Sequence, residues 1–106
     1  IRPKTDPAFL YALAHVLHDR RDFDDALDAV REAIRLEPED ADFHALEAQI
    51  HLANYRWAEA LSAAERGLQV EAQHVASTNL RAVALVKLGR KGQTSNSDIY
   101  RKPQRE

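Results

Sequence analysis

Two histidines and an aspartate that could bind a metal ion lie close together in the first fifth of the chain. His15 and His18 are three residues apart, so on a helix they share one face, and Asp19 follows directly. Two imidazoles and a carboxylate are ligands that zinc or nickel accepts. Two histidines alone are a weak motif, however, and we expect ordinary surface polarity here rather than a metal site.

Catalytic groups are scarce in the rest of the chain. It has no cysteine, and neither Ser62 nor Ser77 stands in a nucleophile elbow. No glycine-rich loop precedes a predicted helix, and no paired carboxylates fall in an evident pocket. Glu47 and His51, four residues apart, can pair on the surface of a helix. The sequence therefore predicts no enzyme, no catalytic residue, no cofactor and no metal.

Composition indicates one helical domain that does not insert into a membrane. The 106 residues are 44% hydrophobic and 30% charged, with only three glycines. No run approaches the roughly 18 apolar residues of a membrane-spanning helix. Because the stretch 1–6 begins with Ile1 and lacks a signal peptide's apolar core, we expect a piece of a longer chain, with the cytoplasm as the favoured compartment.

Charge is distributed unevenly. Acidic residues predominate between residues 6 and 71, whereas bases predominate from 81 to 105. A nucleic acid would have to bind the basic end, but no aromatic residues alternate with these bases and the neighbouring predicted helices are acidic, so we expect no nucleic-acid partner. The bases at this end are Arg90, Lys91, Arg101, Lys102 and Arg105.

The chain aligns with itself at an offset of 34 residues, which is the strongest signal in the sequence. A second step of 34 carries Leu46 to Leu80 and Ala48 to Ala82, and the correspondence stops near Gly92. The result is about two and a half repeats. Identical residues at the offset include Phe9 and Phe43, Ala14 and Ala48, Ala26 and Ala60, Leu27 and Leu61, and Ala29 and Ala63.

Apolar residues within each repeat recur at three and four residues, as on one face of an amphipathic helix. Asp6 can cap a helix that begins at Pro7, Asp22 with Asp25 resembles a capping box, and Pro38 ends a helix. Alanines stand where helices must approach closely. The predicted helices are 7–19, 23–36, 41–53, 57–70 and 75–88, stacked as antiparallel pairs.

The repeat resembles the tetratricopeptide repeat. The resemblance rests on the 34-residue helix–turn–helix unit with Ala14, Phe23, Ala26, Ala33 and Pro38, and on its echo in Ala48, Trp57, Ala60 and Gly67. It implies an all-α fold, a right-handed superhelix of antiparallel helix pairs. We expect an N-terminal extension at 1–6, the repeat domain at 7–92 and a polar basic tail at 93–106.

In such repeats the first helix of each pair lines a concave groove, so the resemblance implies a non-catalytic module that binds a peptide or helix of a partner protein. Tyr11 is the best candidate for an anchor. The lysine, arginine and asparagine clamp that holds a chaperone's C-terminal carboxylate in this family is absent, because its positions hold Tyr11, His15, Leu46, Ala76 and Leu80. The implied groove residues are Tyr11, His15, His18, Asp19, Asp42, Gln49, Leu52, Asn79, Val83 and Lys87, with Ala8, Ala45, Ala53 and Val86 beside them.

The sequence departs from the family pattern in two places. His44 and His51 stand where large apolar residues are usual, and Ala72 replaces the proline equivalent to Pro38, so we expect a looser second repeat. After Gly89 the second helix of the third repeat is missing or altered.

The last predicted helix is apolar on more than one face. Without a following helix, one of these faces stays uncovered. An uncovered apolar face on a small domain favours association, so the alternative function is self-assembly, with a possible homodimer. Its predicted interface residues are Val83, Leu85, Val86 and Leu88.

Overall fold

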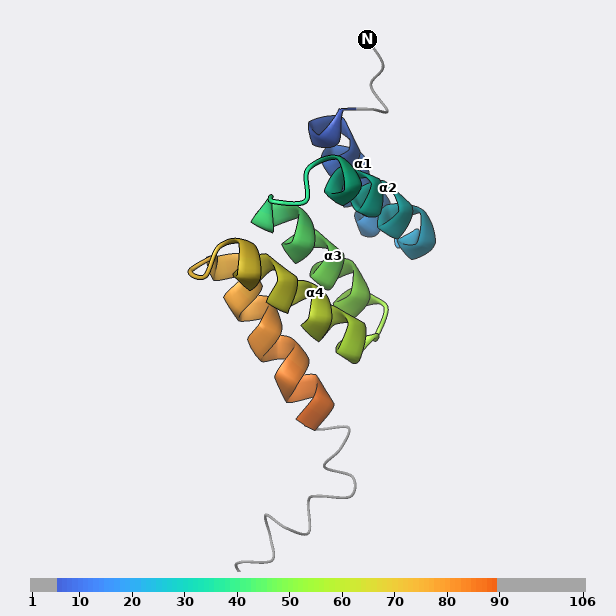
Figure 1. Ribbon diagram of the computed structural model, residues 1–106. Helices are drawn as coiled ribbons and strands as arrows, with labels where there is room; N and C mark the ends of the chain where they lie inside the picture. Colours follow the sequence, from blue (N-terminus) through green and yellow to red (C-terminus); the bar gives the residue numbers. More distant parts are fainter. Residues whose placement is uncertain (1–5, 90–106) are drawn as a thin grey trace, which may run out of the picture.

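The computed structural model describes residues 6–89, which form a row of helices (Figure 1). Helix α1 spans Pro7–Asp19, α2 Phe23–Leu36, α3 Ala41–Ala53 and α4 Trp57–Val70. Residues 75–89 form a further helix, here the C-terminal helix. The described residues contain no strand. The all-α prediction and the predicted helix ranges are confirmed, and the last helix continues through residue 89.

The helices pack as a solenoid of helix pairs. α1 packs on α2 and α3 on α4, while α2 joins the two pairs through its contact with α3. Leu80 of the C-terminal helix packs on a small buried cluster, Ala48, Ala63 and Ala64, so this helix continues the row beside α4 (Figure 1). The N-terminal extension up to residue 5 and the tail at 93–106 lie outside the described residues.

Two of the three predicted helix boundaries follow the expected chemistry. The Asp6 carboxylate accepts a hydrogen bond from the Ala8 N–H at 3.0 Å, and Pro7 is the first residue of α1. α2 ends at Leu36, two residues before Pro38. The predicted box at Asp22 is wrong, because its side chain makes no capping hydrogen bond and pairs instead with Arg20 Nε at 3.4 Å.

The turns inside the two pairs share an unusual backbone conformation. Arg21 has φ 65° and Tyr55 has φ 61°, and the two residues are one repeat of 34 apart. This left-handed region costs a residue with a Cβ about 1 kcal/mol or more relative to glycine. The same strain at the same repeat position indicates that helix packing, rather than residue preference, sets this turn.

Small residues bring the helices together as predicted. Ala14, Ala26, Ala33, Ala48 and Ala60 are all fully buried. The large residues of the main core are Leu10, Leu27, Val30, Phe43, Leu46 and Ile50.

Gly67 of α4 lies in close contact with the C-terminal helix. A Cβ at this position would collide with the hydroxyl of Ser77, which is fully buried in the C-terminal helix. The structure therefore requires the smallest residue at the position where the first repeat has Ala33.

Apolar residues are exposed at both ends of the described row. On α1, Phe9 is 43% and Val16 53% exposed, whereas their repeat equivalents Phe43 and Ile50 are buried in the main core, which α3 shares with α1 and α2. Ala82, the repeat equivalent of the buried Ala48, is exposed at the other end. The large exposed residues of the C-terminal helix are Val83, Leu85 and Val86.

Candidate functional site

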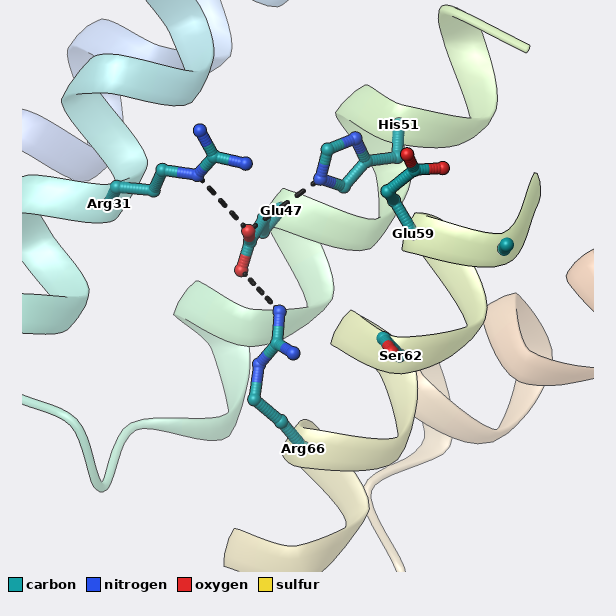
Figure 2. A pocket seen from close by; sticks show the side chains of 7 residues that line it. Arg31, Glu47, His51, Glu59, Ser62 and Arg66 are labelled. Atoms are coloured by element: carbon teal, nitrogen blue, oxygen red, sulfur yellow. Dashed lines mark hydrogen bonds and ion pairs between the residues drawn. The ribbon is translucent and has the colours of Figure 1, made fainter. Parts of the chain in front are cut away.

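Side chains from three helices meet at Glu47, which is buried in α3. Its carboxylate accepts a hydrogen bond from Arg31 Nε of α2 at 3.3 Å and another from Arg66 Nη2 of α4 at 3.1 Å (Figure 2). His51, one turn further along α3, places Nε2 3.6 Å from Glu47 Oε2. We call these four residues the Glu47 cluster. It ties α3 to the helix on either side.

The Glu47 cluster lines a pocket of about 420 Å³ between α2 and α4 (Figure 2). The Arg31 and Arg66 side chains are 55% and 46% exposed, whereas that of Glu47 is 7% exposed. Glu59, also in the wall, forms no ion pair with the residues described. Ala58 and Ser62 complete the lining. Charged ends therefore face the opening, and the buried carboxylate lies beneath them.

Burial and hydrogen bonds act in opposite directions on the pKa of Glu47. Burial raises the pKa of this carboxyl, but the nearby His51 imidazole, hydrogen bonds from Arg66 and Arg31 and the charge of Arg66 lower it from 4.5 to about 2. Glu47 is therefore ionised at neutral pH. A buried charge without partners would cost several kcal/mol, so the two arginines are what allow this carboxylate at a buried position.

Two imidazoles are packed inside the same pair of helices. His44 is 5% and His51 2% exposed, and His44 Nε2 donates to the Pro38 carbonyl at 2.9 Å. Nδ1 of each ring has no hydrogen-bond partner among the described residues. The prediction that Glu47 and His51 pair on a helix surface is wrong about the location, because both side chains are buried.

A second polar link joins α3 to the C-terminal helix. His74 Nε2 lies 2.6 Å from Asp42 Oδ1, and His74 Nδ1 lies 2.8 Å from the Ser77 hydroxyl oxygen. The Asp42 side chain is 64% exposed, so its outer oxygen faces solvent. His74, predicted to be a turn residue, thus also holds the start of the C-terminal helix.

Tyr11 is held from two sides. Its ring meets His15 edge-on at 4.8 Å between centroids and packs against the buried Phe43 ring at 5.2 Å. Burial, and then the charges of Asp42 and Asp40, raise the pKa of Tyr11 above its ordinary value of 10.0. Its hydroxyl therefore lies in the negative field at the start of α3.

These helix pairs and their spacing match a known family. A family model described as tetratricopeptide repeat matches residues 11–73, more than half of the chain. The chain belongs to the tetratricopeptide repeat family. No curated protein matches it. Tetratricopeptide repeats are generally protein-interaction modules built from stacked helix pairs.

The residues that sequence analysis predicts for the groove lie on α1, α3 and the C-terminal helix. Asp42, Gln49 and Asn79 are exposed, and Leu52 is half-buried. Tyr11 and His15 contact each other, whereas the Lys87 ammonium lies over the Trp57 ring of α4, 5.5 Å from its centroid. Lys87 therefore contacts α4, the second helix of the second pair, rather than another predicted groove residue.

The two histidines that suggested a metal site, His15 and His18, contact different partners. His15 stacks on Tyr11, while His18 Nδ1 lies 3.3 Å from Asp19 Oδ1 and its ring approaches Phe23. Within residues 6–89, no three histidine, aspartate or glutamate side chains gather as a metal site. None of the helices described is long and apolar enough to cross a membrane.

The predicted interface residues remain accessible on the C-terminal helix. Val83, Leu85 and Val86 are between 42% and 51% exposed, and Leu88 is half-buried. The predicted covers Ile99 and Tyr100 lie outside the described residues.

Sequence analysis missed the Glu47 cluster as a site, although a signal was present. The 34-residue offset aligns Glu47 with Leu13 in the sequence, and Leu13 is a partly buried residue that packs against the main core. A carboxylate at a core position of this tetratricopeptide repeat requires cationic partners. Arg31 and Arg66, 16 and 19 residues away in sequence, supply them. The repeat register thus gives the position of the buried acid, but sequence spacing does not identify its partners.

Proposed function

We propose that this tetratricopeptide repeat domain is a non-catalytic module that binds a peptide or helix of a partner protein. The binding surface is the predicted groove on α1, α3 and the C-terminal helix, which we call the groove face. The observation that carries the proposal is the packing of Tyr11 between His15 and Phe43. A partly exposed aromatic ring that is already immobilised can anchor a ligand with little further loss of side-chain entropy.

Polar groups beside Tyr11 support the same proposal. The exposed Asp42 carboxylate lies close enough to the Tyr11 hydroxyl to raise its pKa, and Gln49 is exposed on the same helix as Asp42. Carboxylate and amide groups can hydrogen-bond the backbone N–H groups of an extended peptide or pair with a basic side chain. We therefore expect the preferred partner segment to carry an apolar residue for Tyr11 and a basic residue for Asp42.

The test uses peptides selected from a random display library on the immobilised chain. The variant Tyr11→Ala/His15→Ala should weaken the selected peptides about tenfold or more, because the aromatic anchor is lost. The matched control is Tyr55→Asn, which removes a 72% exposed tyrosine in a turn while keeping a residue that tolerates positive φ. Tyr11→Phe keeps the ring and should retain most of the affinity.

Stability must be followed in parallel, because Tyr11 also packs against the core. Thermal melting monitored by circular dichroism shows whether each variant remains folded at the temperature of the binding assay. Peptides that bind the folded double variant as tightly as the natural chain would show that the groove face is not the binding surface.

The exposed apolar residues of the C-terminal helix favour a second candidate function, self-association. A symmetric contact through this helix would bury Val83, Leu85 and Val86 of both copies. Size-exclusion chromatography with light scattering should then detect a dimer at high micromolar concentration, and Val83→Glu/Leu85→Glu should give a folded monomer. A monomeric natural chain at that concentration contradicts this candidate.

A further inference from the structure

The Glu47 pocket is a polar recess that the groove proposal does not use. We propose that it is a second binding site, which takes one carboxylate group from an acidic side chain of a partner polypeptide. The ligands for this carboxylate are the unused N–H groups of Arg31 and Arg66.

The two guanidinium groups are held in place before any ligand arrives. They come from α2 and α4 and converge on the two oxygens of one carboxylate, Arg31 through Nε and Arg66 through Nη2. A guanidinium has five N–H donors, and no other partner of either group occurs among the described residues. The remaining donors suit a second carboxylate, and the entropy of fixing both side chains has already been lost.

Exposure supports an occupant that arrives from solvent. Glu47 is buried, but about half of each arginine side chain is accessible, and both line the same 420 Å³ pocket. The hydroxyl of Ser62 in the wall offers a further donor (Figure 2). A recess open on one side admits a side chain whose backbone stays outside.

The pocket lies on the opposite side of α3 from the groove face. Glu47 precedes the groove residue Gln49 by two positions, which is about 200° around a helix. Gln49 is exposed while Glu47 is buried. The two surfaces can therefore be occupied and tested independently.

Charge selects a carboxylate over a phosphate. Two arginines and two glutamates line the pocket, so their formal charges cancel. Glu59 is two helical turns from Arg66 on α4, about 10 Å along the axis, and opposes a second negative charge entering the pocket. A singly charged carboxylate satisfies the free donors with less repulsion than a phosphate, which carries closer to two charges at neutral pH.

The test is a titration of the full ¹⁵N-labelled chain followed by nuclear magnetic resonance. The probe is an acetylated and amidated Ala-Glu-Ala peptide, and the controls are the Ala-Gln-Ala peptide and inorganic phosphate. The glutamate peptide should shift the arginine Nε–H signals and the amide signals of Ala58 and Ser62, with a dissociation constant of about 1–10 mM, as expected for one ion pair in a recess. The glutamine peptide should leave these signals unchanged, and phosphate should bind more weakly.

Variants separate the site from the fold. Arg31→Lys keeps a positive charge beside Glu47 but loses the planar fork, so it should weaken the glutamate peptide about tenfold while the chain stays folded. The matched control is Arg35→Lys, one turn along α2, whose side chain pairs with Glu32 outside the pocket. Arg35→Lys should bind like the natural chain.

Three results would overturn the proposal. They are shifts of equal size from the glutamine peptide, tighter binding of phosphate than of the glutamate peptide, and unchanged affinity in folded Arg31→Lys. None depends on Tyr11 or His15, so failure here is distinguishable from failure of the groove proposal.

Discussion

His74 donates its Nε2 proton to Asp42 Oδ1 across 2.6 Å, and this contact joins the start of the C-terminal helix to the start of α3. The Ser77 backbone N–H, which can only donate, lies 3.3 Å from His74 Nδ1. Nδ1 is therefore the acceptor, and the proton resides on Nε2. One imidazole thus caps a helix and cross-links two repeats.

Removing His74 should loosen the C-terminal helix. His74→Ala is expected to lower the free energy of unfolding by about 1–2 kcal/mol, because it removes both a cap and a hydrogen bond to a charged group. Urea denaturation of His74→Ala, Asp42→Ala and the double variant measures the coupling between the two side chains. We expect a coupling of about 0.5–1.5 kcal/mol, and strictly additive effects would show that the contact contributes nothing.

Gly67→Ala tests the close approach of α4 and the C-terminal helix. Helix propensity alone predicts that alanine stabilises a helix by about 1 kcal/mol relative to glycine. We expect the opposite sign at residue 67, a loss of about 1–3 kcal/mol, because the new Cβ collides with Ser77. The control is Gly89→Ala, where a Cβ meets nothing within 4 Å and a small gain is expected. Thermal and urea denaturation of both variants measure the two signs.

Acid should destabilise the fold through Glu47. Its pKa in the folded chain is about 2, below the ordinary 4.5, so the unfolded chain takes up this proton first as the pH falls. The contribution of Glu47 is therefore complete above pH 4.5 and is lost as the pH falls towards 2. It amounts to about 3 kcal/mol, since one pKa unit corresponds to about 1.4 kcal/mol.

The measurement is urea denaturation between pH 6 and pH 2.5 on the natural chain and on Glu47→Leu, which takes the residue of the equivalent position 13. The variant should lose less stability on acidification, by about 3 kcal/mol at the low end. Glu59→Gln changes a carboxylate in the same pocket that has no ion pair among residues 6–89, and this variant should retain the natural slope. A Glu47→Leu profile parallel to the natural one would contradict the assigned role of Glu47.

Arg21→Gly should stabilise the turn of the first pair. Arg21 has φ 65°, and glycine relieves up to about 1 kcal/mol of backbone strain there. The neighbouring change Arg20→Gly is the control, because Arg20 has φ −83°, so glycine there relieves no strain, adds freedom to the unfolded chain and removes the ion pair with Asp22. Denaturant midpoints of the two variants should therefore move in opposite directions.

The helices could be predicted from the sequence because their determinants are local and occur twice. The apolar spacing, the Asp6 cap and Pro38 each act within a few residues, and the 34-residue offset checks one repeat against the other. Asp22 shows where local chemistry is insufficient. Its carboxylate had two candidate partners, the helix N–H groups and Arg20, and only the turn geometry decides between them.

The candidate sites were less predictable because their contacts join distant segments. The resemblance assigned groove positions residue by residue, but it did not reveal that Lys87 lies over Trp57 or that Tyr11 packs on Phe43. Asp42 and His74 are 32 residues apart, and nothing in their spacing relates them. Side-chain partners across helices require the packed structure.

The exposed apolar residues at both ends of the row have a consequence for how copies can associate. Within residues 6–89 the series starts with α1 and stops at the C-terminal helix, so it runs from one first helix of a pair to another. In the chain itself, Phe43 and Ile50, the α3 residues that correspond to Phe9 and Val16, are buried in the main core with residues of α1 and α2. Two copies joined end to end through these segments would press α1 of one copy against the C-terminal helix of the other, and this contact would cover Phe9 and Val16 together with Val83 and Leu85. Such a contact joins two different surfaces and could repeat from copy to copy, whereas a contact of the C-terminal helix with itself closes after two copies and leaves Phe9 and Val16 of α1 accessible.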